Sequence, residues 1–114
     1  MDKQAKKEIQ AQYKEREMVG AVYGIRNTQN GKLFVDVSTD LRGMRNRFEF
    51  SVQSGACVQK KLEADWKAQH GKGFLFEVLE ELRSDNTQST TAFKEELLLL
   101  KELWLERLTD EELY

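Results

Sequence analysis

The sequence predicts a small α+β domain: a three-stranded, mostly antiparallel sheet flanked by helices, with an extra helix at the N-terminus. Three observations support this prediction. Two alternating apolar segments meet at Asn30-Gly31, a third alternating segment covers residues 74–80, and the other long segments carry apolar residues at helical spacing. The resulting order is helix, strand, strand, helix, helix, strand, helix, which is typical of an α+β domain.

Residues 19–38 are predicted to form a β-hairpin. Asn30-Gly31 is expected to make a two-residue type I′ turn, because both residues tolerate positive φ, and this turn places Gln29 opposite Lys32. Side chains of a strand alternate between faces, so one face is mostly aliphatic: Val22, Gly24 and Arg26 with Leu33, Val35 and Val37. The opposite face holds Tyr23, Ile25 and Asn27 with Phe34, Asp36 and Ser38.

That second face has two interpretations. A phenol beside an acid and a hydroxyl on neighbouring strands is a possible site, since these groups can exchange protons. A partly covered sheet face explains the same residues, and the residue types alone favour this second interpretation.

The first half of the chain contains two more predicted helices. Residues 2–17 carry a thin apolar stripe and are expected to form a surface helix. Thr39 or Asp40 is predicted to cap a helix that runs to Phe50, followed by a polar loop at residues 51–55.

The second half is predicted to contain a helix, a strand, a loop, a long helix and one more helical turn: residues 58–69, 74–80, 84–90, 91–108 and 110–114. His70-Gly71 is expected to end the first of these helices, with glycine in the left-handed conformation. His70 is therefore interpreted as a neighbour of the helix cap rather than as a catalytic group.

Composition limits the possible classes of protein. A chain of 114 residues with 39% hydrophobic residues suits one domain, with a helix at residues 1–18 and the folded domain at residues 19–114. The longest apolar run, Leu97 to Leu100, is too short to span a membrane, and the N-terminus lacks the apolar core of a secretory signal. The single cysteine, Cys57, fits a reducing compartment, so a cytoplasmic location is expected.

The net charge of −2 conceals an uneven distribution. Residues 42–74 contain seven lysine or arginine residues against three acidic ones, whereas residues 75–114 contain four against eleven. The basic middle segment can contact phosphate groups, or it can consist of ordinary solvated helix faces. Both interpretations remain open at the level of the sequence.

The hairpin residues resemble a known family. GAVY at residues 20–23 and FVDVS at residues 34–38 are similar to the two strands that open the GIY-YIG nuclease domain, and the resemblance extends over about residues 19–108. Two positions depart from the family pattern: Phe34 stands where the family has its second tyrosine, and Asp36 stands where it has glycine.

The resemblance implies a metal-dependent phosphodiesterase acting on DNA. Two strand tyrosines, a helix arginine and a glutamate of the last helix would surround the scissile phosphate and one divalent ion. Tyr23 matches the first tyrosine, and Arg47, followed by an apolar residue, matches the arginine, with Arg42 and Arg45 as alternatives.

The last helix departs further from the pattern. Lys101 occupies the glutamate position, three residues before Trp104-Leu105, and a lysine there would repel a cation. The neighbouring Glu102 is the candidate ligand for Mg²⁺ or Mn²⁺, and Glu106 is an alternative. The predicted nucleic-acid-binding residues are Arg42, Arg45, Lys60, Lys61, Lys67 and Lys101.

Three classes of function follow. The favoured one is a nuclease-like domain that binds nucleic acid with weak or lost metal-dependent cleavage, since Phe34, Asp36 and Lys101 alter the motif. An active nuclease with a rebuilt metal site is the second class. The third is a non-catalytic protein-interaction domain on the same fold, acting through a partner or a second copy.

Overall fold

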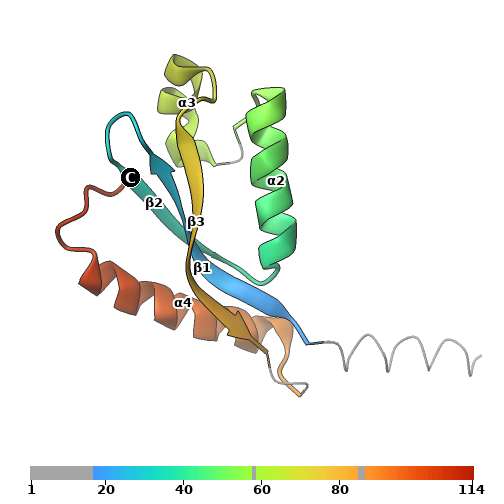
Figure 1. The fold of residues 1–114 in the computed structure, drawn as a ribbon. Helices are drawn as coiled ribbons and strands as arrows, with labels where there is room; N and C mark the ends of the chain where they lie inside the picture. Colours follow the sequence, from blue (N-terminus) through green and yellow to red (C-terminus); the bar gives the residue numbers. More distant parts are fainter. Residues whose placement is uncertain (1–16, 58, 85–86) are drawn as a thin grey trace, which may run out of the picture.

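The computed structural model of the chain describes residues 17–57, 59–84 and 87–114. Its elements are β1 (Val19–Asn27), β2 (Leu33–Ser38), α2 (Leu41–Ser54), the short 3₁₀ helix η1 (Lys60–Leu62), α3 (Glu63–Gln69), β3 (Phe74–Arg83) and α4 (Thr90–Arg107). The sheet has the order β2-β1-β3, and both pairings are antiparallel (Figure 1). The predicted α+β class is confirmed, while the predicted N-terminal helix falls almost entirely outside the described residues.

The helices form a layer on each side of the sheet. α2 and α3 lie on one side and α4 lies on the other (Figure 1). The first side holds a mostly aromatic cluster that includes Tyr23, Phe48 and Trp66, and the second holds an aliphatic cluster that includes Val22 and Leu33. The division of the hairpin into two faces therefore agrees with the sequence prediction, and both faces are covered.

The turn of the hairpin differs from the prediction. The Asn27 N–H donates to the Lys32 carbonyl at 2.8 Å, and the Gly31 N–H donates to the Asn27 carbonyl at 2.8 Å, so the loop has four residues rather than two. Only Gly31 has positive φ, at 79°. The side chain of Asn30 accepts from the Lys32 N–H at 2.9 Å, a local bond that supports the wider turn. The predicted pairing of Gln29 with Lys32 is therefore wrong by two residues.

α2 begins as predicted and ends later. Asp40 caps it, because the carboxylate accepts from the Gly43 N–H at 3.0 Å. The helix runs to Ser54 and not to Phe50, and Gly55 ends it in the left-handed conformation. Ser51 was expected in a polar loop, but it is buried, and its hydroxyl donates to the Phe48 carbonyl at 2.6 Å. Because this hydrogen bond lies within the helix, the hydroxyl can be buried there and the helix continues past Ser51.

The segment after α2 is less helical than predicted. In place of one helix over residues 58–69, η1 is followed by the short α3. Both His70 and Gly71 have positive φ, at 55° and 72°, so the left-handed end of α3 includes the histidine itself.

β3 continues three residues beyond the predicted strand, and α4 starts at Thr90 with Ser89 as its cap. Among the described helices, none is long and apolar enough to cross a membrane.

The last residues form an extended tail rather than the predicted helical turn. The Leu33 N–H donates to the Glu112 carbonyl at 2.9 Å, and the Tyr114 N–H donates to the Leu33 carbonyl at 3.1 Å. The Tyr114 hydroxyl donates to Asp65 at 2.6 Å, and Arg26 forms an ion pair with Glu111 at 3.1 Å. These contacts hold the tail against the edge of β2, which competes with helix formation.

Candidate functional site

Tyr23 lies at the centre of the aromatic cluster on β1. Its side chain is 1% exposed, and its ring stacks on Phe76 with 5.2 Å between the ring centres. The Tyr23 hydroxyl accepts a hydrogen bond from the Gln59 side-chain amide at 3.0 Å. Burial, followed by the charge of Asp36, raises the pKa of Tyr23 well above its ordinary value, and Arg47 and Gln59 offset only part of this rise. The phenol therefore stays protonated at neutral pH.

Asp36 links the hairpin to the last helix. It is the cross-strand partner of Tyr23, so the two side chains leave the sheet on the same face. One of its carboxylate oxygens accepts from the Val37 N–H at 2.8 Å and lies 3.7 Å from the Lys101 ammonium. Because β2 is an edge strand, a lysine from α4 can reach past it to a side chain on the opposite face.

A cavity of about 200 Å³ lies beside this ion pair, at the edge of β2. It is lined by Phe34, Val35, Asp36, Gln59, Lys60, Lys61 and Lys101, and it is called the β2-edge cavity below. Three ammonium groups face it with one carboxylate, so its charge is positive. Gln59, which donates to Tyr23, also lines it, and this places the phenol directly behind its wall.

The backbone of β2 adds a donor on this side. Both the N–H and the carbonyl of Leu33 bond to the tail, so they point away from β1. The same groups of Val35, two residues further along the strand, point in the same direction. Val35 lines the cavity, and its N–H is thus directed toward the cavity side of the strand.

The three candidate arginines of α2 separate onto two sides of the helix. The buried positions Met44 and Phe48 set the rotation of α2 on the sheet. The positive charge of Arg47 lowers the pKa of Tyr23, so Arg47 is the arginine of α2 that interacts electrostatically with Tyr23. Arg45 instead lies over the Phe76 ring at 5.7 Å, and both it and Arg42 line a different cavity.

Two solved structures with a similar fold are catalytic domains of an endonuclease. One is the catalytic domain of the intron endonuclease I-TevI in a mutant form, with a TM-score of 0.57 and 24% identity over 80% of this chain and 84% of that chain. A second, the catalytic domain of the homing endonuclease I-TevI, gives a TM-score of 0.57 and 22% identity over 82% of this chain and 94% of that chain. The chain has the GIY-YIG fold. No family model matches the sequence, and no curated protein matches it.

Within the GIY-YIG fold, the predicted site residues divide into two sets. Lys60, Lys61 and Lys101 line the β2-edge cavity, Tyr23 is linked to it through Gln59, and the charge of Arg47 lowers the pKa of Tyr23. Lys67 lies apart from it and pairs with Glu63 at 3.3 Å on the surface of α3. Arg42 and Arg45 occupy the other side of α2.

A GIY-YIG nuclease implies a divalent ion, and the groups around this cavity do not suit one. Such an ion prefers several oxygen ligands, whereas the cavity offers one carboxylate, already paired with the ammonium of Lys101. Among the described residues, no group of three or more His, Cys, Asp or Glu side chains could hold a metal. Glu102 is exposed on α4, and one residue along a helix turns a side chain by ~100° from its neighbour.

Gln59 is the site residue that the sequence prediction missed. It was placed inside a helix over residues 58–69, but it has an extended conformation just before η1. This conformation lets its amide reach the Tyr23 hydroxyl. An isolated glutamine carries no sequence signal for such a role.

Proposed function

We propose that this domain binds nucleic acid through phosphate contacts at the β2-edge cavity, and that it cleaves nucleic acid weakly or not at all. The observation that carries the proposal is the convergence of Lys60, Lys61 and Lys101 on one cavity from two separate parts of the chain. Lysines dispersed over ordinary solvated helix faces would not line a common cavity.

The chemistry of the cavity suits a phosphate group. Lysine ammonium groups bind phosphate as point charges with three donors each. Lys60 and Lys61 are exposed and free to follow the ligand, while Lys101 is held in place by Asp36. The Val35 N–H adds a fixed donor on the same side, and Arg47 supplies a further positive charge toward Tyr23.

Three features support weak or lost cleavage. The buried Tyr23 keeps its proton at neutral pH, so it is not available as a base. The Lys101–Asp36 pair occupies the place where a carboxylate set would otherwise hold Mg²⁺ or Mn²⁺. Phe34, which also lines the cavity, has no hydroxyl to donate or accept a proton.

The overall charge shapes the expected binding. With a net charge of −2, the protein gains little long-range attraction to a polyanion. Binding then depends on the few cationic contacts of the cavity, and each phosphate contact contributes ~0.7 to 0.9 to the slope of log K against log salt. We expect modest affinity at physiological salt and strong binding only at low salt.

A salt titration of binding tests the proposal. Fluorescence anisotropy with labelled single-stranded and duplex DNA would compare the wild type with the double variant Lys60→Gln/Lys61→Gln. The matched control is Lys72→Gln, which removes an exposed lysine outside the cavity. We expect the double variant to bind at least about tenfold more weakly and to lose about two contacts from the salt slope.

Equal binding by the double variant and the wild type would reject the cavity as the phosphate site. A cleavage gel with Mg²⁺, Mn²⁺ or EDTA tests the second half of the proposal. Strong metal-dependent cleavage that Tyr23→Phe abolishes would show that the enzyme survives with a rebuilt site.

A second candidate function rests on the outer surface of α4. Leu98, Leu99 and Leu103 are 39%, 63% and 50% exposed, and Glu102 and Glu106 are exposed among them. Such a surface suits a protein partner better than a polyanion. Absence of nucleic-acid binding together with a defined oligomer in light scattering would favour this function over the first.

A further inference from the structure

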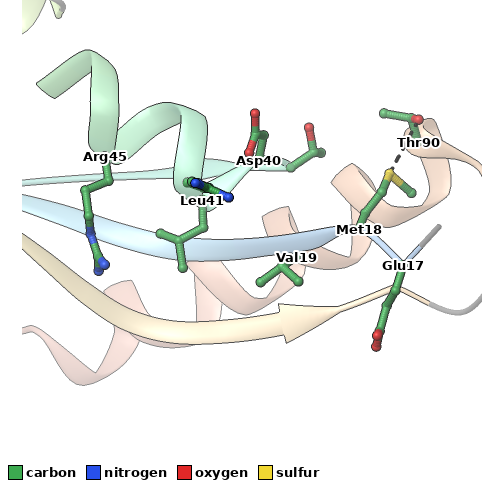
Figure 2. A pocket seen from close by; sticks show the side chains of 9 residues that line it. Glu17, Met18, Val19, Asp40, Leu41, Arg45 and Thr90 are labelled. Atoms are coloured by element: carbon green, nitrogen blue, oxygen red, sulfur yellow. Dashed lines mark hydrogen bonds between the residues drawn. The ribbon is translucent and has the colours of Figure 1, made fainter. Parts of the chain in front are cut away.

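A second cavity, of about 630 Å³, lies where β1, α2 and α4 begin (Figure 2). Its lining includes the apolar residues Met18, Val19 and Leu41 together with Arg42 and Arg45. It is called the Arg42 cavity below. Its volume lies within the range of ~300 to 1,000 Å³ that is usual for sites of small organic ligands.

The acidic residues of this cavity are already engaged. Glu17 forms an ion pair with Arg83 at 3.6 Å, and Figure 2 shows its carboxylate at the opposite end of the lining from Arg45. Asp40 accepts from the Gly43 N–H at 3.0 Å as the cap of α2. The two carboxylates of this lining therefore already interact with partners other than Arg42 and Arg45.

In the described part of the chain, neither arginine has such a partner. Within residues 17–57, 59–84 and 87–114, no carboxylate lies within ion-pair distance of Arg42 or Arg45. Arg45 is held over the Phe76 ring at 5.7 Å, which orients its guanidinium and leaves its edge donors free. Arg45 is thus oriented and Arg42 is exposed, and two arginines on one lining are suited to a carboxylate or phosphate.

The apolar part of the lining is also held in place. The Thr90 hydroxyl donates to the Met18 sulfur at 3.7 Å, and this contact joins the start of α4 to the start of β1 (Figure 2). Leu41 is 8% exposed, so it forms a firm wall beside the arginines. A ligand that fills this cavity therefore meets cations at one end and aliphatic groups at the other.

We infer that the Arg42 cavity binds a small organic anion. Its phosphate or carboxylate group contacts Arg42 and Arg45, and its apolar body packs against Met18, Val19 and Leu41. This site is separate from the proposed nucleic-acid contact, because its lining shares no residue with that of the β2-edge cavity. It therefore adds a ligand to the domain beyond its proposed function.

The test uses 8-anilinonaphthalene-1-sulfonate, a fluorescent anion with an apolar two-ring body. We expect it to bind the full chain at one saturable site. Arg42→Gln/Arg45→Gln should weaken that binding at least about tenfold, since both head-group contacts are lost. Arg42→Gln alone changes an exposed side chain, so it should weaken binding without affecting the fold, which a thermal melt would verify.

Two controls separate this cavity from other surfaces. Lys60→Gln/Lys61→Gln should leave probe binding unchanged, and so should Leu99→Gln/Leu103→Gln on the exposed surface of α4. Competition then defines the ligand: phenyl phosphate against benzoate distinguishes the head groups, and inorganic phosphate tests whether the apolar body matters.

Three results would overturn the inference. The first is equal probe affinity in Arg42→Gln and the wild type. The second is displacement by inorganic phosphate as effective as displacement by phenyl phosphate, which would indicate an anion site without an apolar subsite. The third is displacement of the probe by DNA together with loss of DNA binding in the arginine variants, which would assign this cavity to the nucleic-acid surface.

Discussion

The ammonium of Lys101 on α4 lies 3.7 Å from a carboxylate oxygen of Asp36 on β2. Lys101 belongs to the helix on one face of the sheet and Asp36 projects from the other face, and they meet because β2 is an edge strand. Their side chains are 29% and 36% exposed, so solvent screens part of the attraction. The pair is therefore better placed to shape the charge of the β2-edge cavity than to stabilise the fold.

Reversing the charge of Lys101 tests this role. In Lys101→Glu, two carboxylates face the cavity in place of an ion pair, so we expect DNA affinity to fall by about tenfold or more. The free energy of unfolding should fall by less than ~1 kcal/mol, because the pair is partly exposed. Lys94→Glu makes the same charge change at an exposed position of α4. An equal loss of affinity in both variants would mean that net charge alone matters.

Tyr23 gives the domain a pH-dependent stability. Its pKa is higher in the folded state than in the unfolded chain, so the unfolded chain loses this proton first as pH rises. Stability is therefore complete below pH ~10 and declines above it, by up to ~1.4 kcal/mol per pH unit. Tyr23→Phe should make the alkaline decline shallower in urea denaturation between about pH 8 and 11.

At neutral pH the same variant should be less stable by ~1 kcal/mol, because the Gln59 amide loses its buried partner. The pKa of Tyr114 is also raised, first by burial and then by its bond to Asp65, so Tyr114→Phe is the comparison. An unchanged alkaline slope in Tyr23→Phe would contradict the burial of the phenol.

The tail should control the titration of Asp65. The hydrogen bond from Tyr114 is the main reason that the pKa of Asp65 lies below its ordinary value, with a smaller contribution from Asn30. In Tyr114→Phe we expect the pKa of Asp65 to rise toward ~3.9, measured by carbon-13 NMR of the carboxyl group.

The stabilising contribution of Asp65 is present above pH ~4 and is lost as the pH falls through its lowered pKa, so the variant should lose this contribution at neutral pH. Asn30→Ala is the control and should produce a smaller change. An equal shift of the pKa in both variants would show that the tyrosine bond does not dominate.

A substitution at Gly20 tests the close contact between the sheet and α4. A Cβ at this position would lie 2.5 Å from the Ser38 carbonyl oxygen and 2.9 Å from the Phe93 ring. The backbone carbonyl of Ser38 cannot move away easily, so Gly20→Ala should lower the free energy of unfolding by ~1 to 3 kcal/mol in urea denaturation.

Gly24→Ala is the matched control for this prediction. Its nearest contact, at 2.8 Å, is the end of the flexible Leu33 side chain, so a smaller loss is expected. A smaller effect at Gly20 than at Gly24 would argue against the described packing of α4.

The hairpin shows which features could be predicted from sequence. Its two faces were predicted correctly although the register was wrong by two residues, because a shift of two leaves every side chain on its own face. The turn was wrong because Asn30 can adopt right-handed as well as left-handed conformations, and local side-chain bonds favoured the wider loop. The end of α2 was wrong because a buried serine is indistinguishable in sequence from a loop serine.

The candidate site was predictable only in part. Tyr23 and Lys101 follow from strand alternation and from the resemblance. In the structure Lys101 lines the β2-edge cavity, and Tyr23 is linked to it by the hydrogen bond from Gln59. The choice among the three arginines depends on the rotation of α2, which is fixed by packing against the sheet rather than by any local pattern. Gln59 could not be predicted, because its role arises from the extended conformation before η1.

The tail that closes the edge of β2 at Leu33 also has a consequence for synthesis on the ribosome. β2 is synthesised soon after β1 and can pair with it. The strand that pairs with the other edge of β1, β3, is synthesised later, and so are residues 112–114, which bond to Leu33. A nascent chain that has emerged only as far as β2 holds an isolated two-stranded hairpin, which is marginally stable at best. Residues 112–114 must therefore have left the ribosome before this domain can complete its fold, and a pause before β3 would leave an aromatic surface open to chaperones.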